Sequence, residues 1–205
     1  MVFILLVEDN DDHAILAQAA LSSSDGMFHV ERAASADECL AMLGKRVYDA
    51  VVLDYSLPKK NGLEVLQDIK EIRYDAPVVI VTSHGDEKVA VEAMKQGAYD
   101  YVSKSDDYLA KLPLVLRRAI ETHEMTRERA ELQARIEESE ERYRDLFENA
   151  NDLIQSVAPD GHFMYVNRAW RETLGYSEEE IASLSLFDII HPDSHAHCMQ
   201  VFQRV

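Results

Sequence analysis

Polar side chains follow several short apolar runs of this sequence, at the point where each run ends. The runs and the groups after them are Val2–Val7 with Glu8 and Asp9, Ala50–Leu53 with Asp54, Val78–Val81 with Thr82 and Ser83, and Tyr99–Val102 with Lys104. Short apolar runs of this kind are typical of strands buried in a parallel sheet. Ligands of open α/β sheets bind at the carboxyl ends of the strands. We therefore expect the acids, the hydroxyls and the lysine to lie together at one edge of a sheet.

These residue types suit the transfer of a phosphoryl group. Three carboxylates in one crevice would repel one another, and that repulsion raises their pKa values unless a cation joins them. Mg²⁺ is the expected cation, because it takes carboxylate and carbonyl oxygens as ligands. Lys104 and Thr82 could hold the oxygens of a phosphoryl group, and a carboxylate can itself be the nucleophile. The pattern favours Asp54, at the end of the third strand, as the phosphoacceptor.

The first 105 residues alternate such runs, together with His29–Arg32, with stretches whose apolar residues recur three or four positions apart. This alternation indicates strand–helix–strand units and a parallel sheet covered on both faces. The predicted fold class is therefore α/β, a doubly wound five-stranded parallel sheet in the flavodoxin-like order 2-1-3-4-5. In this order the first, third, fourth and fifth strands are adjacent, which brings the polar strand ends together.

Residues 114–147 contain no glycine and no proline and are rich in charged residues, alanine and leucine, so we expect one long helix there. Pro113 suits the first turn of such a helix, where its missing N–H is not needed. A 4-3-4-3 spacing typical of a coiled-coil seam relates five residues: Leu132, Ile136, Ser139, Tyr143 and Leu146. The segment 114–147 is expected to pair two copies of the chain, with a single solvated helix as the alternative.

Strand patterns return after Asn149. The runs 153–157 and 163–166 flank Asp160-Gly161, which predicts a hairpin with a two-residue turn. Short helices are expected next, at 169–174 and after Ser177, whose hydroxyl suits a helix N-cap ahead of three glutamates. One hairpin and a few short helices make a small core for about 57 residues, so we expect the parent protein to continue beyond Val205.

Four motifs, ILLVEDN, VVLDYSLPKKNGLEVL, VVIVTS and GAYDYVSK, resemble the receiver domain of two-component response regulators. The resemblance implies Mg²⁺ as the cofactor and a histidine kinase or phosphotransfer protein as the phosphodonor. It implies that Asp54 is the phosphoacceptor and that Mg²⁺ is held by Glu8, Asp9, Asp54 and the Ser56 backbone carbonyl. It also implies that Thr82, Lys104 and Tyr101 bind the phosphate and act as the switch, and that Ser56 and His84 tune dephosphorylation. The sequence departs from the family at Ser105, where a proline is usual.

The last part of the chain resembles the N-terminal part of a PAS sensor domain. The matching pieces are Asp160-Gly161, Tyr165-Val166-Asn167, Leu174-Gly175-Tyr176 and His191-Pro192-Asp193. The predicted organisation is a receiver domain at 1–120, a helical linker at 121–147 and a truncated α+β PAS domain at 148–205. The sequence assigns no ligand to the PAS segment.

Composition narrows the partners and the compartment. The net charge of −17 disfavours nucleic acid, which binds to basic surfaces. The apolar runs are too short to cross a membrane, and no basic segment precedes the first of them. The two cysteines, Cys39 and Cys198, fit a reducing compartment. We expect a cytoplasmic protein with no nucleic-acid or membrane partner.

The sequence thus predicts a phosphorelay module that is not itself an enzyme, apart from possible hydrolysis of its own phosphate. The receiver would accept a phosphoryl group and transmit a conformational change through a helix to the PAS segment. The alternative is the N-terminal fragment of a hybrid sensor histidine kinase or a cyclase with its catalytic domain beyond Val205. His123-Glu124 resembles the start of a kinase phosphoacceptor motif, although the proline of that motif is missing.

Overall fold

The computed structural model describes residues 1–23, 28–82, 87–105 and 107–202. The chain forms two compact units, Met1–Arg129 and Ala130–Val205. This division falls inside the predicted linker, 121–147, and the predicted domain limits stay predictions.

The first unit is built on a five-stranded parallel sheet. Its strands are β1 (Val2–Val7), β2 (Phe28–Ala33), β3 (Ala50–Asp54), β4 (Val78–Thr82) and β5 (Asp100–Ser103). Their order is β2-β1-β3-β4-β5, with every neighbouring pair parallel, so the predicted fold class is confirmed. Strands β3 and β4 are buried along their whole length, which is why their sequences are almost continuously apolar.

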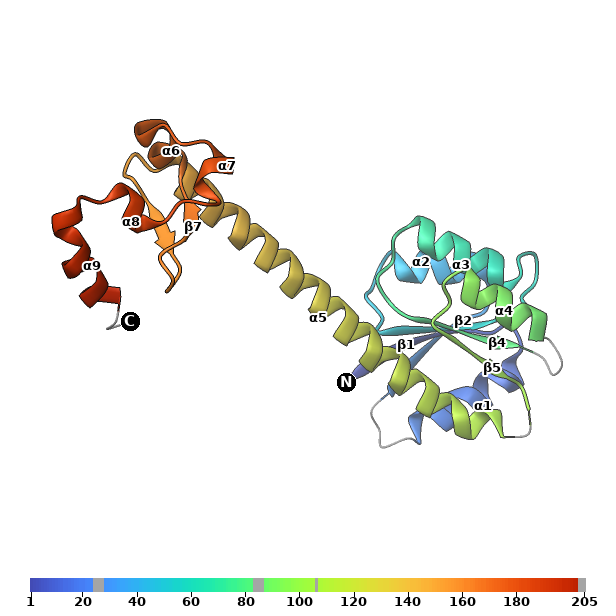
Figure 1. Ribbon diagram of the computed structural model, residues 1–205. Coiled ribbons are helices and arrows are strands. Elements are labelled where there is room, and N and C mark those ends of the chain that lie inside the picture. The colour runs from blue at the N-terminus through green and yellow to red at the C-terminus, as the bar shows by residue number, and fades with distance from the viewer. Residues whose placement is uncertain (24–27, 83–86, 106, 203–205) are drawn as a thin grey trace. The chain divides into compact units, whose positions relative to one another are not determined.

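Helices cover both faces of this sheet (Figure 1). One face carries α1 (Asp11–Ser22) and the first part of α5 (Tyr108–Asn149), and the other carries α2 (Ala36–Leu43), α3 (Gly62–Glu71) and α4 (Glu87–Lys95). Successive strand side chains point to opposite faces. In β1, therefore, Ile4 and Leu6 pack with α1 and α5, whereas Leu5 and Val7 pack with α2 and α3.

The long helix begins earlier than we expected from the position of Pro113 in the sequence. Helix α5 starts at Tyr108, and Pro113 lies inside it. The backbone N–H of Tyr108 donates to the Ser105 carbonyl, and the Lys111 ammonium lies 2.6 Å from the Asp107 carboxylate, so the first turn forms ahead of the proline. Burial of Leu112 and Leu116 against the sheet stabilises the helix on both sides of Pro113. The expected long helix over 114–147 is therefore confirmed, with a corrected beginning.

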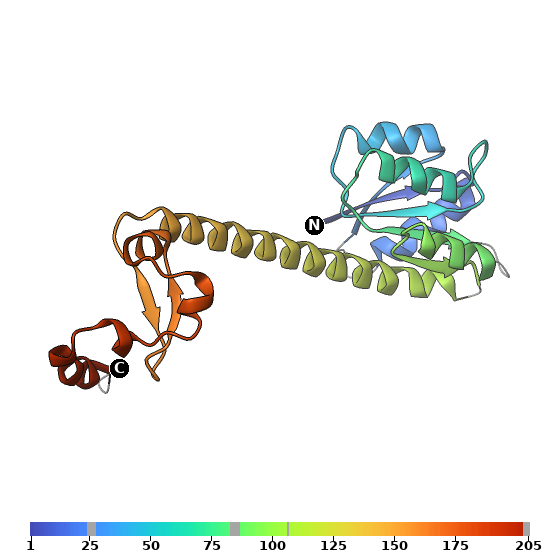
Figure 2. The ribbon, with the colours of Figure 1, turned by 45° about the horizontal axis from the view of Figure 1, so that its top comes forward.

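The second unit combines a hairpin with short helices (Figure 2). After the end of α5 come β6 (Gln155–Val157), β7 (Phe163–Val166), α6 (Arg168–Leu174), α7 (Glu178–Ile181), α8 (Leu186–Ile189), the 3₁₀ helix η1 (Pro192–Ser194) and α9 (His195–Phe202). The predicted antiparallel hairpin and the N-cap at Ser177 are both present, and Ser177 forms a capping box with Glu180.

The turn of this hairpin is longer than the two-residue turn that we predicted from Asp160-Gly161. Ala158 N–H donates to the His162 carbonyl at 2.8 Å, which closes the loop around Pro159, Asp160 and Gly161. Pro159 sets the backbone angle of the first turn position, and Gly161 takes the left-handed conformation at φ 93°. This is the arrangement of a three-residue loop with a glycine bulge, so the two-residue prediction was wrong.

A small core holds the second unit together. Val166, Trp170 and Ile181 are buried in it. Asn167, fully buried, connects its parts: its side-chain oxygen accepts from the N–H groups of Ile154 and Trp170, and its amide donates to the Asp152 carbonyl at 2.8 Å. A buried amide with both ends paired stabilises one arrangement of the chain.

Replacement of Leu116 by alanine should destabilise the first unit by about 2–5 kcal/mol, because Leu116 is fully buried between α5 and the sheet. Leu114, two residues away on the same helix, is 67% exposed, and its replacement by alanine should change stability by less than about 0.5 kcal/mol. Urea unfolding of the full chain measures both. Equal losses would show that the first part of α5 does not pack on the sheet.

Candidate functional site

The strand order brings four predicted residues to one edge of the sheet. Asp54 is the last residue of β3 and Thr82 the last of β4, while Glu8 follows β1 and Lys104 follows β5. Strand β3 lies between β1 and β4, and Thr82 is level with Ser103, which precedes Lys104. Glu8, Asp54 and Thr82 are each at most 4% exposed. The parallel register therefore places charged groups from distant parts of the chain in a buried crevice.

The Lys104 ammonium lies between two of the acids. Its Nζ atom is 2.9 Å from Glu8 Oε2 and 3.1 Å from Asp54 Oδ1. The side chain of Lys104 is only 15% exposed, so water screens these ion pairs weakly. The usual proline after the lysine is replaced by Ser105, and Lys104 still reaches both acids in this arrangement.

Three carboxylates converge at the crevice. One oxygen each of Glu8, Asp9 and Asp54 lies within 4.8 Å of the others, and the first and last of these residues are buried. A single lysine among three acids leaves negative charge uncompensated. Carboxylate oxygens are the ligands that Mg²⁺ prefers, so the chemistry of this donor set fits the expected cation.

Asp54 has a raised pKa. Burial is the largest cause, because it disfavours the charged form, and the neighbouring Glu8 carboxylate raises the pKa further. The Lys104 ammonium and a hydrogen bond from the backbone N–H of Ser56 act in the opposite direction. The phosphoacceptor candidate thus sits in a place where its negative charge depends on the lysine.

Lys104 has a raised pKa as well. Burial alone would lower it, but the hydrogen bond to Glu8 and the charge of Asp54 outweigh burial. The ammonium form is therefore favoured beside the acids. A permanent positive charge at this position can neutralise either a carboxylate or the oxygens of a phosphoryl group.

The segment after Asp54 turns back sharply, so that α3 packs against the end of β3. Asn61 is the N-cap of α3, with a capping box to Glu64, so Asn61-Gly62 begins a helix. A Cβ atom on Gly62 would lie 2.7 Å from the Asp54 carbonyl oxygen, and only glycine allows this approach. The N–H of Gly62 donates to the Tyr55 carbonyl, which fixes α3 against the end of β3.

Arg32, at the end of β2, was not among the predicted site residues. Its guanidinium donates to the backbone carbonyls of Glu8 and Asp9, both at 2.9 Å, and pairs with the Asp11 carboxylate at 2.6 Å. These contacts hold the turn that carries the acidic pair. The run His29–Arg32 ends on this arginine, so the rule of polar strand ends could have found it.

His13 was also missed. Its Nδ1 atom lies 3.3 Å from Lys104 Nζ and 3.7 Å from Glu8 Oε1. The residue lies in the first turn of α1, directly after Asp11 and Asp12 and close in sequence to Glu8 and Asp9. That position is the sequence signal that could have located it.

The other predicted site residues are Tyr101, Ser56, Ser83 and His84, whose predicted roles are not tested by their positions. Tyr101, on β5, is 43% exposed and lies level with Ile80, which agrees with a side chain that can move but does not test its switch role. Ser56 is exposed next to Asp54, and its carbonyl as a metal ligand stays a prediction. Ser83 and His84 lie outside the described residues.

Two sequence families match the chain. The model of the response regulator receiver domain matches residues 4–111, and the model of the PAS fold matches residues 141–205. The first match covers more than half of the chain. The protein therefore belongs to the response regulator receiver family, with a PAS fold following its long helix, and receiver domains of this family take phosphoryl groups from histidine kinases.

Individual relatives agree with this assignment. The chain is 34% identical over 140 residues to an NtrX-like response regulator of Rickettsia bellii, which covers 66% of this chain and 28% of that protein. It is 34% identical over 119 residues to the transcriptional regulatory protein ZraR of Klebsiella oxytoca, and this match covers 58% of this chain and 26% of that protein. The chain thus spans less than a third of the curated relatives it matches.

Solved structures show the same receiver. NtrX from Brucella abortus, crystallised with ADP, is 36% identical with a TM-score of 0.59, and the match covers 64% of this chain and 30% of that one. A CheY-like receiver from Methanospirillum hungatei is 23% identical, with a TM-score of 0.56. The match covers 62% of this chain and 98% of that one, and it supports the fold alone.

Replacement of Asp54 by asparagine should stabilise the chain at pH 7 when no divalent cation is present. The raised pKa means that folding disfavours the Asp54 carboxylate, so stability is lost as pH rises from the unfolded pKa through the folded one. The advantage of the variant should therefore vanish below about pH 4, where the unfolded carboxyl is also protonated. Urea unfolding in EDTA across this range measures it, with exposed Asp145→Asn as the control. A variant advantage that persists undiminished at low pH would contradict this explanation.

Replacement of Arg32 by lysine should weaken Mg²⁺ binding roughly tenfold, because lysine cannot bridge the carbonyls of Glu8 and Asp9 together. Calorimetric titration with Mg²⁺ measures the loss. Arg46→Lys is the matched control, since Arg46 pairs with Glu31 and lies 3.8 Å over the Phe3 ring, away from the acids. An equal loss in both variants would assign the effect to general destabilisation of the sheet.

Proposed function

We propose that this protein is a phosphorelay signalling module whose receiver accepts a phosphoryl group on Asp54 from a histidine kinase or phosphotransfer protein. One observation carries the proposal: the Lys104 ammonium lies within 3.1 Å of Asp54 and 2.9 Å of Glu8, at the carboxyl ends of parallel strands. An isolated acid at a strand end has ordinary structural roles. A buried acid that shares a lysine with a second acid is suited to phosphoryl chemistry.

The reaction is a transfer between two nucleophiles. A carboxylate oxygen of Asp54 attacks the phosphorus of the donor's phosphohistidine, so that a P–O bond forms while the P–N bond breaks. The donor imidazole keeps the electron pair of that bond and takes up a proton. The product is an aspartyl phosphate on this chain.

The chain's own residues stabilise the charge of the transferred group. Lys104 is placed to pair with a phosphoryl oxygen instead of the Asp54 oxygen it now contacts. The hydroxyl of Thr82, at the neighbouring strand end, would donate to the same group. Glu8, Asp9, Asp54 and the Ser56 carbonyl would hold Mg²⁺, whose positive charge would offset the negative charge of the phosphoryl oxygens during transfer.

The phosphate would act on the structure through Lys104 and Thr82. A phosphoryl group adds about −1.5 to −2 charges at pH 7, which would draw both residues toward it and let Tyr101 change its rotamer. A small cavity is lined by Asp54, Lys104, Tyr108 and other residues. Because Tyr108 begins α5, movement of Lys104 would reach the first turn of the long helix, which continues toward the PAS segment.

We also propose that two copies of the chain pair through the segment 114–147 and that the protein works in the cytoplasm without a nucleic-acid partner. The part of the chain that the structure describes contains no helix both long and apolar enough to cross a membrane. The ligand of the PAS segment is not assigned. We expect no enzymatic action on other substrates, apart from hydrolysis of the chain's own phosphate, which Ser56 and His84 would tune.

The alternative is a hybrid kinase or cyclase whose catalytic domain follows Val205. The surroundings of His123 argue against its being the phosphoacceptor histidine of a kinase within this chain. Its Nε2 atom is buried and lies 3.1 Å from the Asp75 carboxylate, so a phosphodonor could not approach that nitrogen.

Incubation of the chain with Mg²⁺ and acetyl phosphate should add one phosphate, because acetyl phosphate can replace the protein donor and release acetate. Intact-mass measurement should show the gain in the natural chain and in the control Asp37→Asn, whose carboxylate lies in the first turn of α2. The gain should disappear in Asp54→Asn and fall strongly in Asp9→Asn.

If the natural chain gains no phosphate, binding of beryllofluoride to the same sample should be measured. Absence of both would overturn the proposed chemistry, whereas beryllofluoride binding without phosphate gain would indicate a strict need for a protein donor. A gain retained in Asp54→Asn would place the phosphoacceptor elsewhere.

A further inference from the structure

The two parts of α5 have different surroundings. In the first part, Leu112, Leu116, Ala119 and Ile120 are buried against the sheet. The His123 ring lies 3.1 Å from Asp75 in the loop before β4, which extends this contact. Further along, the side chains of the coiled-coil seam are exposed: Leu132 by 50%, Ile136 by 53%, Tyr143 by 70% and Leu146 by 65%. The exposed seam therefore begins only where packing on the receiver ends.

The spacing of the seam defines its heptad positions. Leu132, Ser139 and Leu146 take the d positions, and Ile136 and Tyr143 take the a positions. A β-branched residue at a combined with leucine at d favours two parallel strands. The flanking positions then follow: Arg135 and Arg142 at g, Glu140 and Phe147 at e.

We infer that the stretch 129–149 of α5 binds the same stretch of a second copy as a parallel, in-register coiled coil, with Arg135 of each helix beside Glu140 of the other. The inference rests on the pairing proposed above and restricts it to the second part of the helix. In a parallel coil a g residue faces the e residue five positions further along the partner helix. The pair Arg135–Glu140 has this spacing and opposite charges, and the twofold symmetry gives two such pairs.

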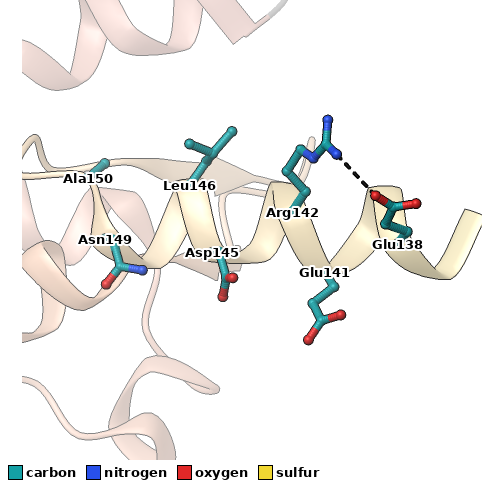
Figure 3. Close-up of a pocket in the computed structure, with 7 residues that line it drawn as sticks. All are labelled: Glu138, Glu141, Arg142, Asp145, Leu146, Asn149 and Ala150. Carbon is teal, nitrogen blue, oxygen red and sulfur yellow. Dashed lines mark hydrogen bonds and ion pairs between the residues drawn. The ribbon is translucent and has the colours of Figure 1, made fainter.

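The charges also disfavour the antiparallel alternative. An antiparallel coil places g beside g, which here would bring the basic residues Arg135 and Arg142 to the same flank. Figure 3 shows Arg142 and Leu146 on one side of α5, with Glu141 and Asp145 extending from the other. Arg142 pairs along its own helix with Glu138 at 3.1 Å, whereas neither Arg135 nor Glu140 has an ion-pair partner within the described chain.

An apolar groove continues from the seam within the second unit. Its lining includes Tyr143 and Phe147 of α5 and Met164, Tyr165 and Val166 of β7, together with charged residues such as Glu140. Tyr143 belongs to both the seam and the groove. A partner helix on the seam would therefore cover Tyr143 and the near edge of the groove, and it would bring Arg135 of the partner toward Glu140.

Sedimentation of the full chain over a range of concentrations tests the surface. Leu132→Asp should weaken dimerisation by more than roughly tenfold, because a carboxylate would replace apolar contact on both helices. Leu114→Asp is the matched control, since it places the same charge at an exposed leucine on the same helix outside the seam. A monomeric natural chain, or a loss in Leu114→Asp equal to that in Leu132→Asp, would overturn the proposed surface.

Charge exchange and cysteine crosslinking test the orientation. Arg135→Glu and Glu140→Arg should each weaken the dimer, and the double variant should restore it. In a Cys198→Ser background, Arg129→Cys and Ser139→Cys should each crosslink to themselves with a short bismaleimide, while Glu141→Cys on the outer face should not. Crosslinking at one seam position without the other, or no restoration in the double variant, would overturn the parallel register.

The phosphorylation assay separates this inference from the proposed function. Leu132→Asp keeps every residue of the crevice and should still gain one phosphate from acetyl phosphate. If the natural chain gains phosphate and remains a monomer, the coiled coil is wrong and the receiver function stands. If the natural chain dimerises and the two seam cysteine variants crosslink, but the natural chain neither gains phosphate nor binds beryllofluoride, the receiver chemistry fails and the interface stands.

Discussion

The contact of one lysine with two buried acids is the interaction on which the site depends. Glu8 and Asp54 lie at the carboxyl ends of adjacent strands, and burial places their charges where repulsion is strong. Lys104 approaches from β5, two strands away from β3. Its ammonium offsets part of the repulsion, but with Asp9 nearby the crevice keeps excess negative charge. This imbalance explains why the same residues suit both a divalent cation and a phosphoryl group.

The lysine also connects the crevice to the long helix. Lys104 is followed by Ser105, whose carbonyl accepts from the first N–H of α5, and Tyr108 lines the same small cavity as Asp54. A change in the charge at Asp54 therefore acts within one helical turn of the start of α5. The apolar contacts of Leu112 and Leu116 hold that start against the sheet, so the helix cannot respond independently of the receiver.

The second unit depends on different interactions. Its core is small, and Asn167 compensates by linking the end of α5, the hairpin and α6 through hydrogen bonds. Arg171 of α6 adds an ion pair to Glu148 of α5 at 2.9 Å. These polar contacts tie the hairpin to the last turns of the helix. A rotation of those turns would therefore move the residues of the PAS segment that are bonded to them.

The sequence by itself determined the strands and the polar residues at their ends, because buried parallel strands are read from continuous apolar runs. The strand order was predicted from the fold class that the alternation of strands and helices indicates, and the structure confirms it. The sequence also indicated the seam from Leu132 onward. Only the tertiary structure decided that Arg32 and His13 join the site, that α5 begins before Pro113 and that the hairpin turns around Pro159. These features depend on contacts between segments distant in the chain or on backbone hydrogen bonds that outweigh local preference. Residue types and their spacing do not encode such contacts directly.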